Sequence, residues 1–174
     1  MHVLVATDGE LETATAAEFA ATLAGPDGRV TVLTVVEIPR TFLNDVRAHY
    51  GTGDGPSVVA DYTYVETPKA HQEGPTGWPG DAALIDRYLR DKLRRQTDPL
   101  VHALDERGVP TDARVVESED VAGTIIDQIV ALDAEVVVVG SHGQGLFQGL
   151  LGSTGTKIVR RSPRPVLLLR SATP

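Results

Sequence analysis

A chain of 174 residues, 41% hydrophobic and 23% charged, has the composition of a single globular domain spanning residues 1–174. Its net charge of −8 argues against nucleic acid as a partner, and no apolar run approaches the roughly 20 residues of a membrane-spanning helix. Cysteine is absent, which excludes disulfides, thiolate nucleophiles and cysteine metal sites. The chain begins as an apolar strand without a basic leader, so we expect no signal peptide and a cytoplasmic protein.

The first 36 residues predict a strand, a helix and a second strand. Val3–Ala6 is short and apolar, and Asp8 follows at its carboxyl end. Residues 11–24 are rich in alanine and predict an amphipathic helix, whose apolar face we expect at Leu11, Thr15, Phe19 and Leu23. Arg29–Val36 is apolar and β-branched, as a buried strand requires. This βαβ unit is expected to be right-handed.

Residues 39–80 form an excursion that interrupts the pattern with many glycines and prolines. Long connections without regular structure are uncommon in compact domains and tend to be functional. Within it, Thr41–His49 and Val58–Val65 are candidates for a helical turn and a short strand. We expect Trp78 to fasten the excursion to the body rather than to stack on a ligand. Because the excursion leaves the carboxyl end of the second strand, we expect a lid or an addition to a dimer contact.

The remainder of the chain alternates helices with strands. A long helix begins at Asp81 and is expected to kink or restart at Asp98-Pro99, because proline suits the first turn of a helix. Ser118 or Asp120 caps the next helix. Further strands are predicted at Ala113–Glu117 and Val136–Val139. A short helix is predicted at Thr154–Arg161, and the last strand at Pro165–Leu169. Five strands in alternation with four helices predict an α/β fold, an open parallel sheet with helices on both faces, and a ligand crevice at its carboxyl ends.

Several segments at these carboxyl ends predict an anion site. Gly140 and Gly143 follow the run of four valines and leave backbone amides uncovered, and Gly152–Thr154 opens a helix whose positive end favours phosphate. Asp8 could accept from ribose hydroxyls or hold a metal that bridges the phosphates, and Val35 could pack on a base. Alternatively, the glycines only shape a turn and cap a helix. The expected convergence of four elements favours ligand binding.

Fast catalysis has little support in the sequence. His142 has no serine, carboxylate or second histidine at a defensible spacing, so we expect a solvated loop histidine. The P-loop, dinucleotide and nucleophile-elbow motifs are all missing. Lys157, Arg160 and Arg161 lie late in a helix, where they can complement its negative end. Lys157 lies nearest the glycine loop and could instead reach a terminal phosphate. Binding, with at most slow hydrolysis, fits better.

Three stretches resemble the universal stress protein family. They are Val3–Glu10 (VLVATDGE), Val32–Glu37 (VLTVVE) and Val136–Leu169 (VVVVGSHGQGLFQGLLGSTGTKIVRRSPRPVLLL). The resemblance implies a Rossmann-like sheet of the adenine nucleotide alpha hydrolase type, with strand order 3-2-1-4-5. It also implies a homodimer that pairs the last strands, here Val166, Leu167, Leu168 and Leu169. In the nucleotide-binding branch it implies ATP, with or without Mg²⁺, in the crevice.

By position, nine residues match the nucleotide site of that branch: Ala6, Asp8, Val35 beside the adenine, and Gly140, His142, Gly143, Gly152, Ser153 and Thr154 in the phosphate and ribose loop. The family motif places nine residues between its second and third glycines, whereas eight residues lie between the corresponding Gly143 and Gly152 here. This deletion shifts which amides point inward, although Gly145 and Gly149 give freedom to absorb it.

Two functions therefore stay open from the sequence. One is a stress protein that binds ATP as a sensor or store. The other is a dimeric interaction module of the same fold with a vacant or occluded crevice. An adenylyl-transferring enzyme is a third and weaker reading, because no histidine-rich transfer motif is visible.

Overall fold

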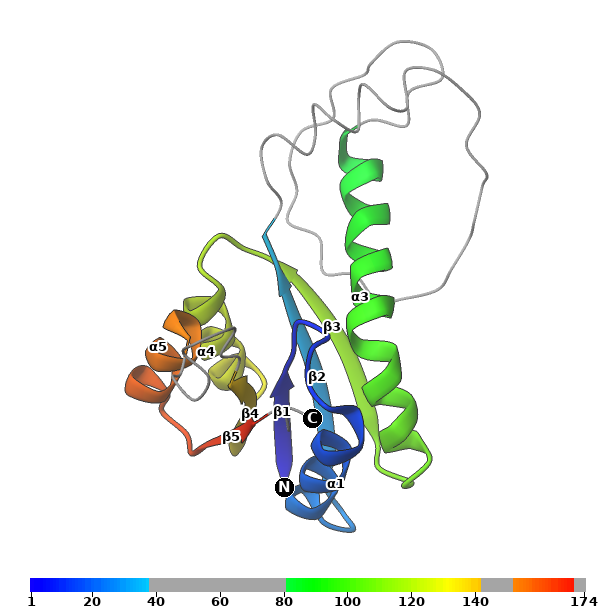
Figure 1. The fold of residues 1–174 in the computed structure, drawn as a ribbon, viewed down its shortest axis with the longest axis vertical. Helices are drawn as coiled ribbons and strands as arrows, with labels where there is room; N and C mark the ends of the chain where they lie inside the picture. The colour runs from blue at the N-terminus through cyan, green and yellow to red at the C-terminus, as the bar shows by residue number, and fades with distance from the viewer. Residues whose placement is uncertain (38–80, 142–151, 171–174) are drawn as a thin grey trace. The chain divides into compact units, whose positions relative to one another are not determined.

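The computed structural model describes residues 1–37, 81–141 and 152–170. Its elements, in chain order, are β1 His2–Ala6, α1 Thr13–Ala24, β2 Arg29–Val36, α3 Asp81–Asp105, β3 Thr111–Glu117, α4 Val121–Ala131, β4 Val136–Ser141, α5 Ser153–Arg161 and β5 Val166–Arg170 (Figure 1). One compact unit consists of Met1–Glu37 and Leu89–Pro174, and it contains the whole sheet. A second unit, Ile38–Tyr88, is described only at the start of α3.

Several sequence-based expectations lie outside the described residues. These are the roles of the 39–80 excursion as a lid or dimer contact, the two short elements expected within it, and the anchoring role of Trp78. They stay predictions.

The sheet confirms the expected topology. All four strand pairs are parallel, and the strand order is β3-β2-β1-β4-β5. Ala6 of β1 lies opposite Leu33 of β2 on one side and Val139 of β4 on the other. From β1, the chain adds β2 and β3 on one side of the sheet and then β4 and β5 on the other, so the strand order reverses between β1 and β4. In open α/β sheets a ligand crevice forms at such a point.

Both faces of the central strands are buried, which explains their continuous apolar runs. On one face, Val3 and Val5 of β1 and Val30 and Val32 of β2 pack with α1 and α3. On the other face, Leu4, Leu33 and Val137 pack with α4 and α5. Figure 1 shows these two helix pairs on opposite sides of the sheet.

The buried face of α1 differs from the expected one. The helix buries four of its six alanines, which are Ala16, Ala17, Ala20 and Ala24, whereas Phe19 is 45% exposed. Small side chains allow the helix axis to lie close to the strands. Of the expected apolar face, Leu11 is buried in the core and Leu23 packs against it, but Phe19 is exposed. The helix also begins later than Leu11, because the Glu12 carboxylate accepts from the amides of Ala14 and Thr15 at 3.0 and 2.7 Å.

α3 is one continuous helix through Pro99, so the expected restart is wrong. Leu93, Leu100 and Leu104 are buried along one side and hold both halves against the sheet. The Thr97 hydroxyl donates to the Leu93 carbonyl at 2.6 Å just before the proline.

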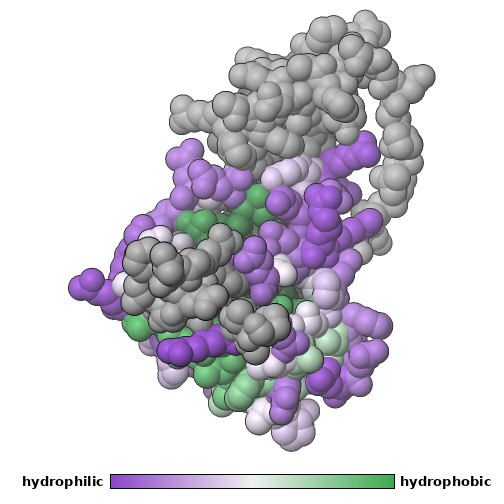
Figure 2. All heavy atoms as spheres, viewed as in Figure 1, coloured by the Kyte–Doolittle hydropathy of each residue, from purple (hydrophilic) through white to green (hydrophobic). Residues whose placement is uncertain are grey.

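Figure 2 shows hydrophilic residues along α3 in this view. Among the described helices, none combines the length and apolarity needed to cross a membrane.

The cap of α4 is Asp120, one of the two expected candidates. Its carboxylate accepts from the Gly123 amide at 3.1 Å, and the Ser118 hydroxyl instead accepts from the Asp120 amide. A side chain at Gly123 would collide with this carboxylate, because an added Cβ would lie 2.4 Å from Asp120 Oδ2.

A buried histidine lies at the amino end of β1. His2 is 7% exposed, with Nδ1 at 3.0 Å from the Leu132 carbonyl and Nε2 at 2.8 Å from the Thr31 hydroxyl. Because a carbonyl only accepts, Nδ1 carries the proton and Nε2 accepts from Thr31. Burial, followed by the positive charge of Arg29, lowers the pKa of His2 below its ordinary value of 6.5.

We therefore expect acid to destabilise the fold through His2. Since the pKa of His2 is lower in the folded than in the unfolded state, its contribution is fully present above the unfolded pKa of about 6.5 and is lost as pH falls through the folded pKa. Urea unfolding between about pH 7.5 and pH 5 measures this loss. His2→Asn should show a shallower pH dependence than the wild type, and equal slopes would contradict the assignment.

Candidate functional site

The strand register brings the ends of β1, β2 and β4 together at one edge of the sheet. The Thr7 amide, one residue beyond the end of β1, donates to the Leu33 carbonyl at 2.9 Å. The chain is therefore still paired with β2 where the loop after β1 begins. On the other side, Gly140 comes directly after Val139, the partner of Ala6. The loop after β1 therefore leaves the sheet between the ends of its two neighbours.

The loop after β1 is a tight turn held by its own side chains. Gly9 adopts φ +94°, a conformation that favours glycine, and its amide donates to the Thr7 hydroxyl at 2.9 Å. The Glu10 amide donates to Asp8 Oδ1 at 3.1 Å. The carboxylate of Asp8 thus stabilises the turn and is exposed at the edge of the sheet.

Gln96 of α3 also holds this loop, and sequence reasoning missed it. Its side-chain oxygen accepts from the Thr34 hydroxyl at 2.6 Å, and its side-chain nitrogen donates to the Asp8 carbonyl at 2.7 Å. The available signal was its position: Gln96 stands between Leu93 and Leu100 at helical spacing, on the buried side of α3. A polar side chain on the buried side of a helix costs free energy unless it is hydrogen-bonded, so this position predicts a specific hydrogen-bond partner.

Within the described residues, the amino end of α5 has no capping partner. Its N-cap is Gly152, which supplies no side-chain acceptor, and in the described part of the chain nothing accepts from the amides of Ser153, Thr154 or Gly155. Three amides and the positive end of the helix dipole can therefore receive an anion.

One side chain anchors α5 beside the edge of the sheet. Ile158 is the buried residue of α5 and belongs to the same apolar cluster as Ala6 and Val139. Figure 1 shows α5 starting on the side of the carboxyl ends of the strands. The open amides thus lie on the side of the sheet where β1 and β4 end.

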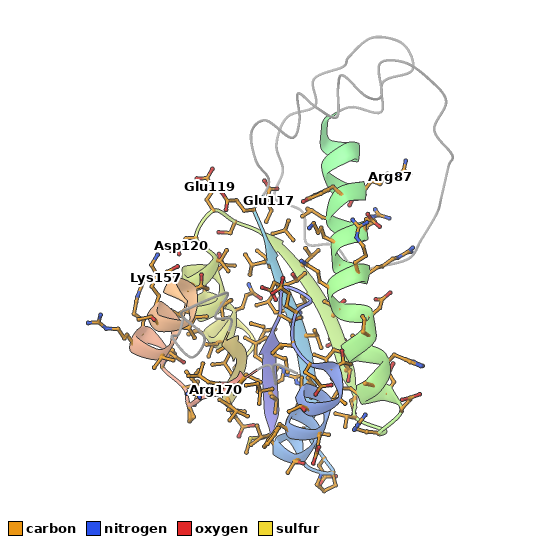
Figure 3. All side chains as sticks on the ribbon, viewed as in Figure 1. Arg87, Glu117, Glu119, Asp120, Lys157 and Arg170 are labelled. Atoms are coloured by element: carbon orange, nitrogen blue, oxygen red, sulfur yellow. The ribbon has the colours of Figure 1, made fainter. Side chains whose placement is uncertain are left out.

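The charged side chains around this edge differ in their availability. Lys157 is exposed and makes no ion pair within residues 1–37, 81–141 and 152–170. In Figure 3 it extends from α5 toward the side where Asp120 begins α4. Arg164 contacts Asp133 at 2.8 Å, but this pair precedes β5 and β4 and therefore lies at the opposite, amino ends of the strands. Among the described residues, no group of three or more His, Cys, Asp or Glu side chains is placed to hold a metal ion.

The structure describes seven of the nine predicted site residues. Ala6 is buried, Val35 is half-buried and packs against the cluster under α4 and α5, and Asp8 is exposed. Gly140 lies within β4, and the others are at the start of α5: Gly152, Ser153 and Thr154. His142 and Gly143 lie outside the described residues, together with the shortened loop. The roles assigned to all nine stay predictions.

Solved structures share this fold. One is a universal stress protein in complex with cAMP, with a TM-score of 0.55 and 17% identity, covering 99% of this chain and 98% of that one. Another is the universal stress protein of Archaeoglobus fulgidus in complex with dAMP, with a TM-score of 0.52 and 18% identity, covering 97% and 96%. At these identities the likeness concerns the fold.

The sequence comparisons identify the family. A universal stress protein of Mycolicibacterium smegmatis is 31% identical over 122 residues, which are 67% of this chain and 36% of the relative. The chain thus spans little more than a third of that relative's length. The model of the universal stress protein family matches residues 1–170, which is nearly the whole sequence. The chain therefore belongs to the universal stress protein family.

Proposed function

We propose that this protein binds an adenine nucleotide at the carboxyl ends of β1, β2 and β4, with ATP as the favoured ligand and Mg²⁺ accompanying its phosphates. The observation that carries the proposal is the open amino end of α5 on the same side of the sheet as the Asp8 turn. The cAMP and dAMP complexes of family members with this fold support the choice of an adenine ligand.

The proposed roles follow the positions of the residues. Val35, at the end of β2, contacts the base, and the Asp8 carboxylate accepts from the ribose. The Ser153 and Thr154 amides and hydroxyls bind phosphate, together with the backbone from Gly140 onward. In this account the protein is a cytoplasmic, single-domain sensor or regulator of the stress response, with at most slow hydrolysis.

Equilibrium dialysis against ATP, AMP, cAMP and GTP tests this function. We expect saturable binding of the adenine nucleotides at one site per chain, and weaker binding of GTP. Equal affinity for GTP would contradict the adenine assignment. A folded protein that binds none of the four would favour the alternative, an interaction module without a nucleotide.

Lys157 should distinguish ATP from AMP. Because it is exposed in the middle of α5, one turn after Ser153, we expect Lys157→Gln to weaken ATP binding about three- to five-fold and to leave AMP binding unchanged. Arg161→Gln removes the same charge from the far end of the helix and is the matched control. Equal losses for ATP in both variants would assign the effect to net charge alone.

The last strand is the proposed dimer contact. β5 lies at one edge of the sheet, and Leu168 is 37% exposed on it. Val166 and Leu167 are half-buried, while Leu169 is buried. A sheet edge with apolar side chains favours pairing with a second copy.

Leu168→Asp should convert the dimer into a monomer, because a charge on an edge strand opposes pairing. Sedimentation velocity measures the change. Val130→Asp is the control, since Val130 is an exposed apolar residue on α4. A wild type that is monomeric, or a Leu168→Asp protein that stays dimeric, would rule out this contact.

A further inference from the structure

Gln96 connects the two strand ends that the proposed function assigns to the nucleoside. Thr34 comes immediately before Val35, the proposed base contact, and its hydroxyl donates to Gln96 Oε1 at 2.6 Å. Asp8 is the proposed ribose contact, and its carbonyl accepts from Gln96 Nε2 at 2.7 Å. One amide group therefore spans from β2 to the loop after β1.

The contact is closely packed. Thr34 is fully buried and Gln96 is half-buried, so the hydrogen bond between them is partly shielded from water, whereas the bond to the Asp8 carbonyl is exposed. A Cβ added at Gly9 would lie 3.2 Å from Gln96 Cγ and 3.4 Å from its Cα, so the turn rests directly against α3. The opening lined by Thr7, Gly9, Gln96 and Leu100 has a volume of about 20 Å³, which is room for about one water.

Only an amide satisfies both partners as they stand. The Thr34 hydroxyl needs an acceptor and the Asp8 carbonyl needs a donor, and glutamine supplies one of each. An ionised glutamate could accept from Thr34, but it would present a lone pair to the Asp8 carbonyl. The repulsion would displace the turn that carries the Asp8 carboxylate.

We propose that Gln96 is a positioning residue for nucleotide binding, which fixes the separation between Val35 and the Asp8 turn and so sets the fit of the nucleoside. This inference rests on the proposed function. Gln96 acts on the nucleoside end and not on the phosphates, so its loss affects AMP and ATP to the same extent. That pattern differs from the one expected for Lys157.

The test compares Gln96→Glu with the wild type in binding of AMP and of ATP at neutral pH. We expect both affinities to fall about 10-fold. Gln128→Glu, on α4, makes the same chemical and charge change away from this contact and should bind both nucleotides as the wild type does. A Gln96→Glu protein with wild-type affinity for AMP, or one that loses affinity only for ATP, would overturn the proposal.

Amide hydrogen exchange in the nucleotide-free protein gives an independent readout. We expect Gln96→Glu to speed exchange at the Gly9 and Glu10 amides, which the turn protects, while exchange in the centre of β1 stays unchanged. If the wild type binds no nucleotide, the proposed function fails, and exchange alone judges whether Gln96 holds the turn. Unchanged exchange at both amides would overturn the proposal in either case.

A second variant guards against poor folding of Gln96→Glu. Thr34→Val removes one hydroxyl from the other end of the contact and keeps the shape of the side chain. It should weaken AMP and ATP equally, by about three-fold. Full affinity for both nucleotides in this variant would count against the link to β2.

Discussion

Replacing Gly152 with aspartate is expected to stabilise the fold and to weaken nucleotide binding strongly at the same time. Gly152 is the N-cap of α5, with φ −58° and ψ 166°, a backbone conformation open to any residue. An aspartate there can accept from the amides of the first turn and complements the helix dipole, which should add about 0.5 kcal/mol to the free energy of unfolding. The same carboxylate occupies the proposed phosphate position and repels the ligand, so we expect affinity for ATP to fall about 50-fold.

Gly152→Asn is the matched control, because asparagine caps a helix with the same shape and no charge. It should stabilise the protein to a similar extent and weaken ATP far less than the aspartate does. Urea unfolding and a nucleotide titration on the same samples measure both effects. If Gly152→Asp binds ATP as tightly as Gly152→Asn, phosphate does not bind at the start of α5.

Truncation of Ile158 should cost the largest free energy of any change in α5. Ile158 is 1% exposed and is the buried residue of this nine-residue helix. Ile158→Ala leaves a cavity in the cluster that includes Leu4, Ala6 and Val139, and we expect a loss of about 3 kcal/mol. Because the side chain anchors the helix whose amides form the proposed phosphate site, nucleotide affinity should fall as well.

Val159→Ala is the control for Ile158. It shortens the neighbouring residue, whose side chain is exposed, and should change stability by less than about 0.5 kcal/mol. Urea unfolding monitored by circular dichroism gives both values. A loss below about 1 kcal/mol in Ile158→Ala would contradict the anchoring role.

The architecture was predictable because the strands carry continuous apolar runs. Val136–Val139 and Arg29–Val36 have the β-branched composition of strands covered on both faces, and both are strands in the structure. The strand order was implied by the resemblance to the family, since alternation of elements alone does not determine it. The parallel sheet in that order confirms both inferences.

The errors in the helices have local physical causes. The spacing of large apolar residues predicted that Phe19 lies on the buried face of α1, but the helix packs against the sheet through alanines. Alanine is only weakly hydrophobic, so it contributes little to the periodic pattern from which a buried face is predicted. Pro99 suggested a restart of α3, yet Leu93, Leu100 and Leu104 bury the helix on both sides of it. Tertiary packing outweighed the local preference in both helices.

The candidate site was only partly accessible to sequence reasoning. Asp8 and the start of α5 could be found because Asp8 comes soon after the first strand and Gly152–Thr154 opens a helix. Gln96 could not be assigned, because it comes from α3 and its partners Thr34 and Asp8 are 62 and 88 residues away. Whether the eight-residue loop after Gly143 still binds phosphate depends on residues outside the described part of the chain.

Calorimetric titration of the folded wild type with Mg-ATP tests the central claim most directly. We expect a saturable heat at one nucleotide per chain, which is reduced about 50-fold in affinity by Gly152→Asp. Absence of binding heat at about 1 mM nucleotide, which corresponds to a binding free energy weaker than about −4 kcal/mol, would contradict the claim.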